Sequence, residues 1–334
     1  ITRKVADRLQ ELFSTMRSEF ESKWDDLKIF IEYGLVTDEK FAEKAEKFML
    51  FKNTEGKYFT FEEYKELIKE NQTDKNGNLV YLYAEDVESK HSFIEQAKAK
   101  GYDVLIMNGP LDSHFINWFE NKNKQTVFER VDSNVVDKLI QKEHSLINAL
   151  SSQQQELLRP VFESQLPTGE KINYNIAFEP MDANDIPVAI KQDEFMRRMK
   201  EMAMVSGGGM SQFYAQMPDN YTIAVNSNHP LVADILGDVE REYGDKLDSI
   251  NKKIDSAQSQ QNNLLNLIKD KKEDELTAEE KAMRTELSEK VTRLTDERNT
   301  RLREIGKENN LVRQIIDLAL LSNGMLKGKN LTDF

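Results

Sequence analysis

The sequence predicts a helix-rich fold of mixed α and β class, in which a helical connector and a small α/β module precede an α+β domain. Three observations support this prediction. Residues 1–56 show helical periodicity, short strand-like and helical segments alternate through residues 57–150, and a heptad seam runs through residues 238–305. Alternation of strands and helices is typical of parallel sheets, whereas a heptad seam predicts a coiled coil.

The connector is predicted to consist of amphipathic helices. Apolar residues recur at helical spacing in one long stripe, namely Val5, Leu9, Leu12, Phe13, Met16, Phe20 and Trp24, which predicts a single long helix. Gly34 is expected to end the next helix, and a further stripe follows at residues 41–48. Thr60 and Glu63 have the spacing of a capping box, so another helix is expected to begin there.

The α/β module is predicted from a change of period after residue 78. Leu79–Tyr83, Asp103–Met107 and Val127–Val131 are typical of short buried strands. Helical patterns at residues 89–99 and 113–120 separate them. Strands that alternate with helices are expected to pair in parallel through right-handed crossovers.

A second domain is predicted over residues 151–334, with an inserted helical hairpin at residues 238–305. Its seam has spacings of three and four at Leu247, Ile250, Ile254, Ala257, Gln261, Leu264 and Ile268. Thr277 and Glu280 have capping-box spacing where the chain turns back. Two tightly joined helices favour an antiparallel hairpin, about 45 Å long at roughly 1.5 Å per residue. The segment Leu311–Leu321 is apolar almost all round and therefore needs burial on more than one side.

The composition excludes several classes of partner. The 59 acidic and 46 basic residues give a net charge of −13, which repels nucleic acid. The chain contains no cysteine, which fits a reducing cytoplasm. No apolar run reaches the roughly 18 residues that span a membrane. Because Ile1 and Phe334 both fall inside helical patterns, the chain is expected to be a fragment of a longer protein.

The residues show no catalytic or metal site. His91, His114, His144 and His229 share no ligand spacing, and without cysteine a zinc site would need many carboxylates. The glycines at 207–209 do not follow a strand, so they do not resemble a phosphate-binding loop. Residues 74–78 superficially resemble a calcium loop, but the early glycine and the missing glutamate favour a turn. We therefore expect no catalytic residues, no metal and no cofactor in this chain.

A cluster of methionines is the first candidate binding feature. Six of the 12 methionines fall within 22 residues, from Met196 to Met217. On a helix, Phe195, Met199, Met202 and Ala203 would share one face, while Met196 and Met204 would lie off it. This pattern fits an ordinary core helix with flexible filler, but it also fits a mobile surface that repacks against many partners. From the residues alone, both interpretations stay open.

The segment Asp112–Phe119 is the second candidate. Its four large apolar side chains, Phe115, Ile116, Trp118 and Phe119, cannot all face one core from a single short helix. Either Trp118 or Phe115 lies on the surface, where large aromatic side chains are effective anchors, or the side chains divide between two packing layers.

Four stretches of the sequence resemble the ninety-kilodalton heat-shock chaperone family in its bacterial form. They are Trp24–Glu66, Gly101–Phe115 (GYDVLIMNGPLDSHF), Asn228–Leu231 (NHPL) and Asn310–Leu326 (NLVRQIIDLALLSNGML). The resemblance implies a homodimeric, ATP-driven chaperone of the stress response, of which residues 1–150 are the later part of the middle domain. Residues 151–334 would be the carboxy-terminal dimerisation domain. ATP and magnesium would bind to the missing amino-terminal domain, so this chain itself is not expected to be an enzyme.

The resemblance also implies where unfolded client proteins and a second protomer bind. Client contacts are expected on the methionine-rich helix and near residue 114, namely at Phe195, Met196, Met199, Met202, Ala203, Met204, His114, Phe115 and Trp118. The dimer interface is expected at Leu311, Ile315, Ile316, Leu318, Ala319, Leu320, Leu321, Leu326 and Leu331, weakened if the chain stops at Phe334.

The inserted hairpin departs from the family pattern, and the resemblance assigns it no role. A second hypothesis is therefore a structural coiled-coil protein whose arm docks a partner. A third, a small-molecule enzyme built on the α/β module, is disfavoured because the module lacks a glycine loop.

Overall fold

The computed structural model describes residues 2–134, 139–140, 146–168, 171–206, 209–269, 271–272, 275–326, 328 and 331–332. Phe334, His144 and the two glycines at 207–208 lie outside these ranges. The chain divides into two compact units. Unit 1 contains residues 1–145, 169–175 and 190–222, and unit 2 contains residues 146–168, 176–189 and 223–334. The expected domain boundary at Ser151 stays a prediction.

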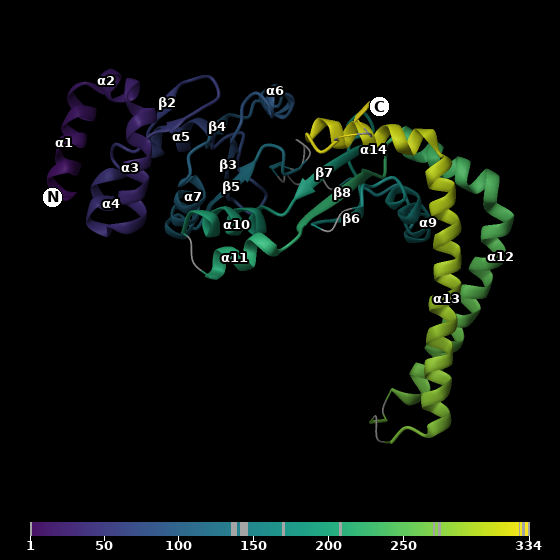
Figure 1. The fold of residues 1–334 in the computed structure, drawn as a ribbon. Coiled ribbons are helices and arrows are strands. Elements are labelled where there is room, and N and C mark those ends of the chain that lie inside the picture. Colours follow the sequence, from purple (N-terminus) through teal and green to yellow (C-terminus); the bar gives the residue numbers. More distant parts are fainter. Residues whose placement is uncertain are drawn as a thin grey trace. The chain divides into compact units, whose positions relative to one another are not determined.

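The helical part of unit 1 is formed by four helices, labelled in Figure 1 as α1 (Thr2–Thr15), α2 (Arg17–Ser22), α3 (Trp24–Thr37) and α4 (Glu39–Ala45). The prediction of one long helix from Val5 to Trp24 is wrong, because the backbone leaves the helical conformation at Met16 and Lys23. These breaks redirect the chain so that Phe20 and Trp24 are both fully buried.

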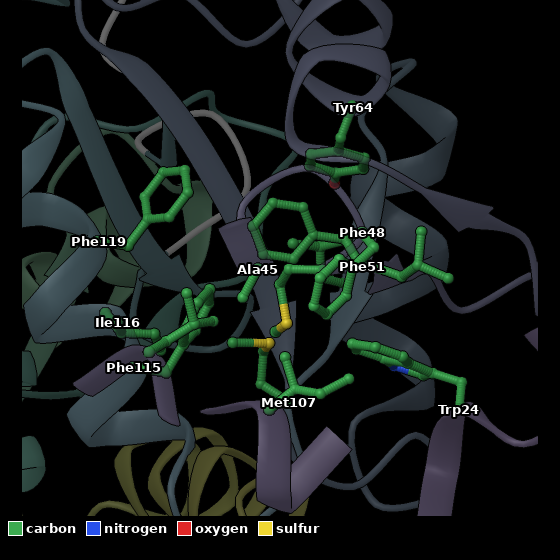
Figure 2. Packing of buried hydrophobic residues seen from close by; sticks show 14 of the residues in the cluster. Trp24, Ala45, Phe48, Phe51, Tyr64, Met107, Phe115, Ile116 and Phe119 are labelled. Carbon is green, nitrogen blue, oxygen red and sulfur yellow. The ribbon is translucent and has the colours of Figure 1, made fainter. Parts of the chain in front are cut away.

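An aromatic core joins these helices to the α/β module of unit 1. Figure 2 shows Phe51 among aromatic side chains from several elements. Its ring centroid lies 5.5 Å from that of Tyr64 and 6.0 Å from that of Phe115. Phe51 comes from the short β1 (Phe51–Lys52), which pairs antiparallel with β2 (Tyr58–Phe59). Tilted and edge-on ring pairs of this kind stabilise a core beyond their buried area.

The module itself contains α5 (Phe61–Ile68), β3 (Leu79–Ala84), α6 (His91–Ala99), β4 (Val104–Ile106), α7 (Asp112–Lys122) and β5 (Thr126–Arg130). The predicted parallel sheet is confirmed, because β3 lies between β4 and β5 and pairs in parallel with both. The predicted capping box at Thr60 and Glu63 is confirmed. The turn interpretation of residues 74–78 is also confirmed, since Asp74 accepts the backbone N–H groups of Asn76 and Asn78 at 2.8 Å.

A second sheet follows, with the strand order β6-β8-β7. Its strands are β6 (Ile172–Glu179), β7 (Val188–Gln192) and β8 (Asp219–Asn226). Between β7 and β8 the chain forms α10 (Glu194–Ser206) and α11 (Gly209–Gln216). Both helices group with unit 1, although the sequence placed them in the second domain.

Unit 2 is dominated by long helices, namely α9 (Ser152–Glu163), α12 (Pro230–Ile268), α13 (Ala278–Glu308) and α14 (Asn310–Ser322). Figure 1 shows α12 and α13 side by side, and Ile254, Ala257 and Leu294 form a small apolar cluster between them. The predicted cap at Thr277 is confirmed. The coiled-coil character of the hairpin stays a prediction. Among the described residues, no helix is both long and apolar enough to cross a lipid bilayer.

Candidate functional site

The methionine-rich helix α10 is attached to the α/β module of unit 1 through a buried arginine. Arg197 is only 6% exposed. Its guanidinium donates to the Tyr83 hydroxyl and, at 2.7 Å, to the Glu194 carboxylate. It also forms ion pairs with Glu85 and Glu201. A buried charge with several partners of opposite sign is held much more firmly than an exposed ion pair.

Backbone and hydroxyl groups of the module complete this network. The Arg130 N–H donates to Glu194 Oε1 at 2.9 Å, and the Tyr83 hydroxyl lies 3.1 Å from the same oxygen. Burial, with the nearby Glu194 charge, raises the pKa of Tyr83 well above its usual value, so this hydroxyl stays protonated and able to donate. The network thus links α10 to β3 and β5.

Further polar side chains of α10 also face the protein. Arg198 donates to Glu120 of α7 at 3.0 Å, and the Ser113 hydroxyl of α7 donates to Glu201. Lys200 lies 2.6 Å from a carboxylate oxygen of Asp219. Polar contacts therefore link helices α7 and α10, both labelled in Figure 1. The sequence analysis missed Arg197, although its acidic neighbours at positions i−3 and i+4 were a usable signal.

Several apolar side chains of α10 remain on the surface as a consequence. Phe195 is 66% exposed and Met204 is 68% exposed. Met196, Met199 and Met202 are half-buried, whereas Ala203 is buried. Two exposed residues that the sequence analysis missed extend the apolar surface, namely Val205 on α10 and Phe213 on α11. We call Phe195, Met196, Met199, Met202 and Met204 the α10 apolar surface.

The residues of α7 that were expected to contact clients differ in their exposure. Phe115 is fully buried, so the prediction that it belongs to a binding surface is wrong. Its side chain packs instead in the aromatic cluster around Phe51. His114 and Trp118 are half-buried. Trp118 lines a cavity of about 520 Å³ together with Phe61. The Nζ of Lys122 lies 5.4 Å from its ring centroid, within the range of a cation–π contact.

The expected dimer residues on and after α14 fall into two groups. Five are buried inside unit 2, namely Ile315, Ile316, Ala319, Leu320 and Leu326. Leu318 and Leu321 on α14, and Leu331 beyond it, are exposed, and Leu311 is half-buried. Because Leu311, Leu318 and Leu321 follow at i, i+7 and i+10, they share one face of the helix. Within the described part of unit 2, this face carries the exposed side chains of Leu318 and Leu321.

Within the described ranges, no three acidic or histidine side chains come together in an arrangement that would hold a metal ion. His229 has a structural role instead, because its Nδ1 accepts the Leu231 N–H at 3.1 Å and caps α12.

The sequence matches known proteins along its whole length. Residues 1–256 match the family model described as Hsp90 protein. The chain is 44% identical over 334 residues to chaperone protein HtpG of Bacteroides thetaiotaomicron, covering 100% of this chain and 49% of that protein. A Bacteroides fragilis relative of the same name shows the same identity and coverage. The Porphyromonas gingivalis HtpG is 40% identical, covering 100% of this chain and 48% of that protein.

The chain therefore spans about half the length of the curated relatives it matches. The family match extends over residues 1–256 of 334, which is well over half of the chain. On this evidence the chain belongs to the Hsp90 protein family.

Proposed function

We propose that this chain is part of a molecular chaperone that binds partly unfolded client proteins on a homodimeric scaffold. The observation that carries the proposal is the reversed polarity of α10. Arg197 of this helix is buried, while Phe195 and Met204 are more than 60% exposed. Exposed methionine and phenylalanine side chains can repack against many apolar partners without a fixed shape.

The family membership supports the same function, because the curated relatives are named chaperones. We propose that the full-length protein is driven by ATP and magnesium bound to a domain outside this chain. This chain would then contribute binding surfaces and no catalysis of its own. We place the protein in the cytoplasm, and we propose that the exposed face of α14 forms the dimer contact. Two weak client sites in one dimer gain affinity from their high effective concentration.

The proposal is tested by replacing Phe195 and Met204 with Ser in the full-length protein. Both side chains are exposed, so the fold should survive, as circular dichroism would show. The variant should suppress aggregation of a heat-unfolded client several-fold less well than the parent. The matched control is Phe30→Ser, which removes a similarly exposed apolar side chain (73%) from α3. Unchanged suppression by the Phe195 and Met204 variant would remove α10 from the client site.

A second function, the docking of a partner by the hairpin, is favoured by a different observation. Leu265, Leu267 and Met283 are all exposed near the end of the arm. Ala257 and Leu294 belong to one cluster, so residues 258–292 can be replaced by a four-residue loop. If the chaperone proposal holds, client protection survives this deletion. Loss of protection with α10 intact would instead assign client binding to the arm.

A further inference from the structure

A cavity of about 450 Å³ opens beside α3 in unit 1, and its lining includes no residue of α10. Its walls come from α3, from the segment Met49–Lys52 and from the loop Ile106–Pro110. Side chains of opposite character line it. Trp24, Met107 and the acidic residue Glu32 are among the residues that line it. We call this the Glu32 cavity. Its volume is within the range of roughly 300–1,000 Å³ that is usual for small-ligand sites.

Glu32 is an unusual residue to find in this position. Its side chain is buried, with 0% exposure for the residue as a whole. Neither of its carboxyl oxygens has a hydrogen-bond partner among the described residues. A buried carboxyl group without such partners is costly, so the group is retained at a considerable loss of stability.

Lys28, which lies near Glu32, is already engaged with another carboxylate. Lys28 Nζ lies 2.6 Å and 2.9 Å from the two oxygens of Asp112, but 3.7 Å from Glu32. Asp112 also accepts the Gly109 N–H at 2.7 Å. At the cavity opening, Asp25 pairs with Lys52 at 2.8 Å. Counted over the described residues, the cavity region thus contains three carboxyl groups, of Glu32, Asp112 and Asp25, and two ammonium groups, of Lys28 and Lys52.

We propose that the Glu32 cavity binds an organic cation, a primary ammonium or guanidinium group on a short aliphatic stem. The charged group would donate hydrogen bonds to Glu32, and the stem would lie against Trp24 and Met107. An indole ring and a carboxylate are together a favourable environment for such a cation. A free amine and the side chain of a lysine or arginine residue share this chemistry, and the test separates these two sources.

The electrostatics of the cavity set the pH dependence of this binding. Burial, together with the Asp112 charge and against the Lys28 charge, raises the pKa of Glu32 to about 9. At neutral pH this carboxyl group is therefore protonated and uncharged, and a cation that binds must displace the proton. Below pH 9, the association constant should increase roughly tenfold for each unit by which the pH is raised. One proton is released for each cation bound. Asp25 and Lys52 are paired with each other, so they add little to this dependence.

The experiment is calorimetric titration of the full chain with butylguanidinium and with butylammonium at pH 7, 8 and 9. Titrations in two buffers of different ionisation enthalpy measure the released proton. A capped tripeptide with a central arginine forms the second arm. Binding of the peptide would identify a polypeptide source, whereas binding of the small cations alone would identify a free amine. Both results support binding of a cationic group. Pentanol, a neutral molecule of similar size, is the control for binding that does not depend on charge.

Glu32→Gln should weaken cation binding at pH 9 at least tenfold, because the amide keeps the shape and loses the charge. Asp25→Asn is the matched control, since Asp25 lines the same cavity but its side chain is 71% exposed. That control should leave the affinity within about twofold. Ile29→Trp, at a half-exposed rim position, should block the cavity without changing its charges.

Three results would overturn the proposal. They are equal binding of the cations by Glu32→Gln, binding of pentanol as tight as that of butylguanidinium, and no binding of either cation at millimolar concentration and pH 9. None of these results would affect the client-binding proposal, which rests on a different helix.

Discussion

Arg197 of α10 donates a hydrogen bond to the hydroxyl of Tyr83, which lies 114 residues earlier in the sequence. This contact places the polar groups of a methionine-rich helix against the protein. An amphipathic helix normally buries its apolar stripe. Here a charged residue is buried instead, and apolar side chains are left on the surface as a result.

Replacing Arg197 with Ala should destabilise the protein by about 3 kcal/mol. The change leaves Glu194 and Tyr83 in a buried position without their cation, which costs more than the loss of one exposed ion pair. Urea unfolding followed by circular dichroism measures the effect. Arg241→Ala, in which the lost ion pair is exposed, should cost less than about 1 kcal/mol. Equal effects of the two variants would show that the buried network has no special role.

A glycine in α13 should be irreplaceable where the helix crosses α9. A Cβ atom at Gly306 would lie 2.3 Å from the backbone oxygen of Val161, which cannot move aside without shifting α9. Gly306→Ala should therefore destabilise unit 2 by about 2 kcal/mol. A Cβ atom at Gly237, in α12, would meet no other atom within 4 Å. Gly237→Ala should stabilise the protein by about 0.5–1 kcal/mol, because alanine favours a helix. Thermal unfolding of the two variants compares these opposite signs.

Stability should fall as the pH rises because of Glu32. Its pKa in the folded protein is about 9, above the ordinary value of 4.5. Between these two pH values the folded state binds a proton that the unfolded state has lost, so the free energy of unfolding decreases with pH. Glu32→Gln should remove this part of the slope. The variant should match the parent near pH 4 and exceed it in melting temperature at pH 8.

A second buried carboxyl group contributes to the slope that the variant should keep. Burial raises the pKa of Glu129 to about 7, so this group acts in the same direction between pH 4.5 and 7. A parent and a variant with identical pH profiles above pH 7 would contradict the assignment to Glu32.

The exposed face of α14 should control dimerisation. Leu318→Asp places a charge on a half-exposed leucine that faces away from the core of unit 2, so the monomer should still fold. If Leu318 lies in the dimer contact, the dissociation constant should rise roughly thirtyfold or more, as expected for a central interface residue. Sedimentation equilibrium measures it. Leu267→Asp on the hairpin is the control, and an unchanged dimer in the Leu318 variant would move the interface elsewhere.

The sequence by itself determined the local structure of this protein. Helix caps at Thr60 and Thr277 and the parallel strands around Leu79–Tyr83 were all predictable, because each depends on neighbours within a few residues or on a regular period. The family resemblance was likewise readable from continuous stretches of residues. Even so, the sequence could not show that the first stripe breaks at Met16, because a helical period continues across a short break.

Only the tertiary structure decided which side chains are exposed. The sequence left Phe115 and the methionine helix open, and the fold buries Phe115 while it exposes Phe195 and Met204. The physical reason is that burial depends on the distant element that packs against a residue. Two partners of Arg197, Tyr83 on β3 and Glu85 just after it, lie more than 100 residues away in the sequence. No periodicity within α10 predicts these contacts.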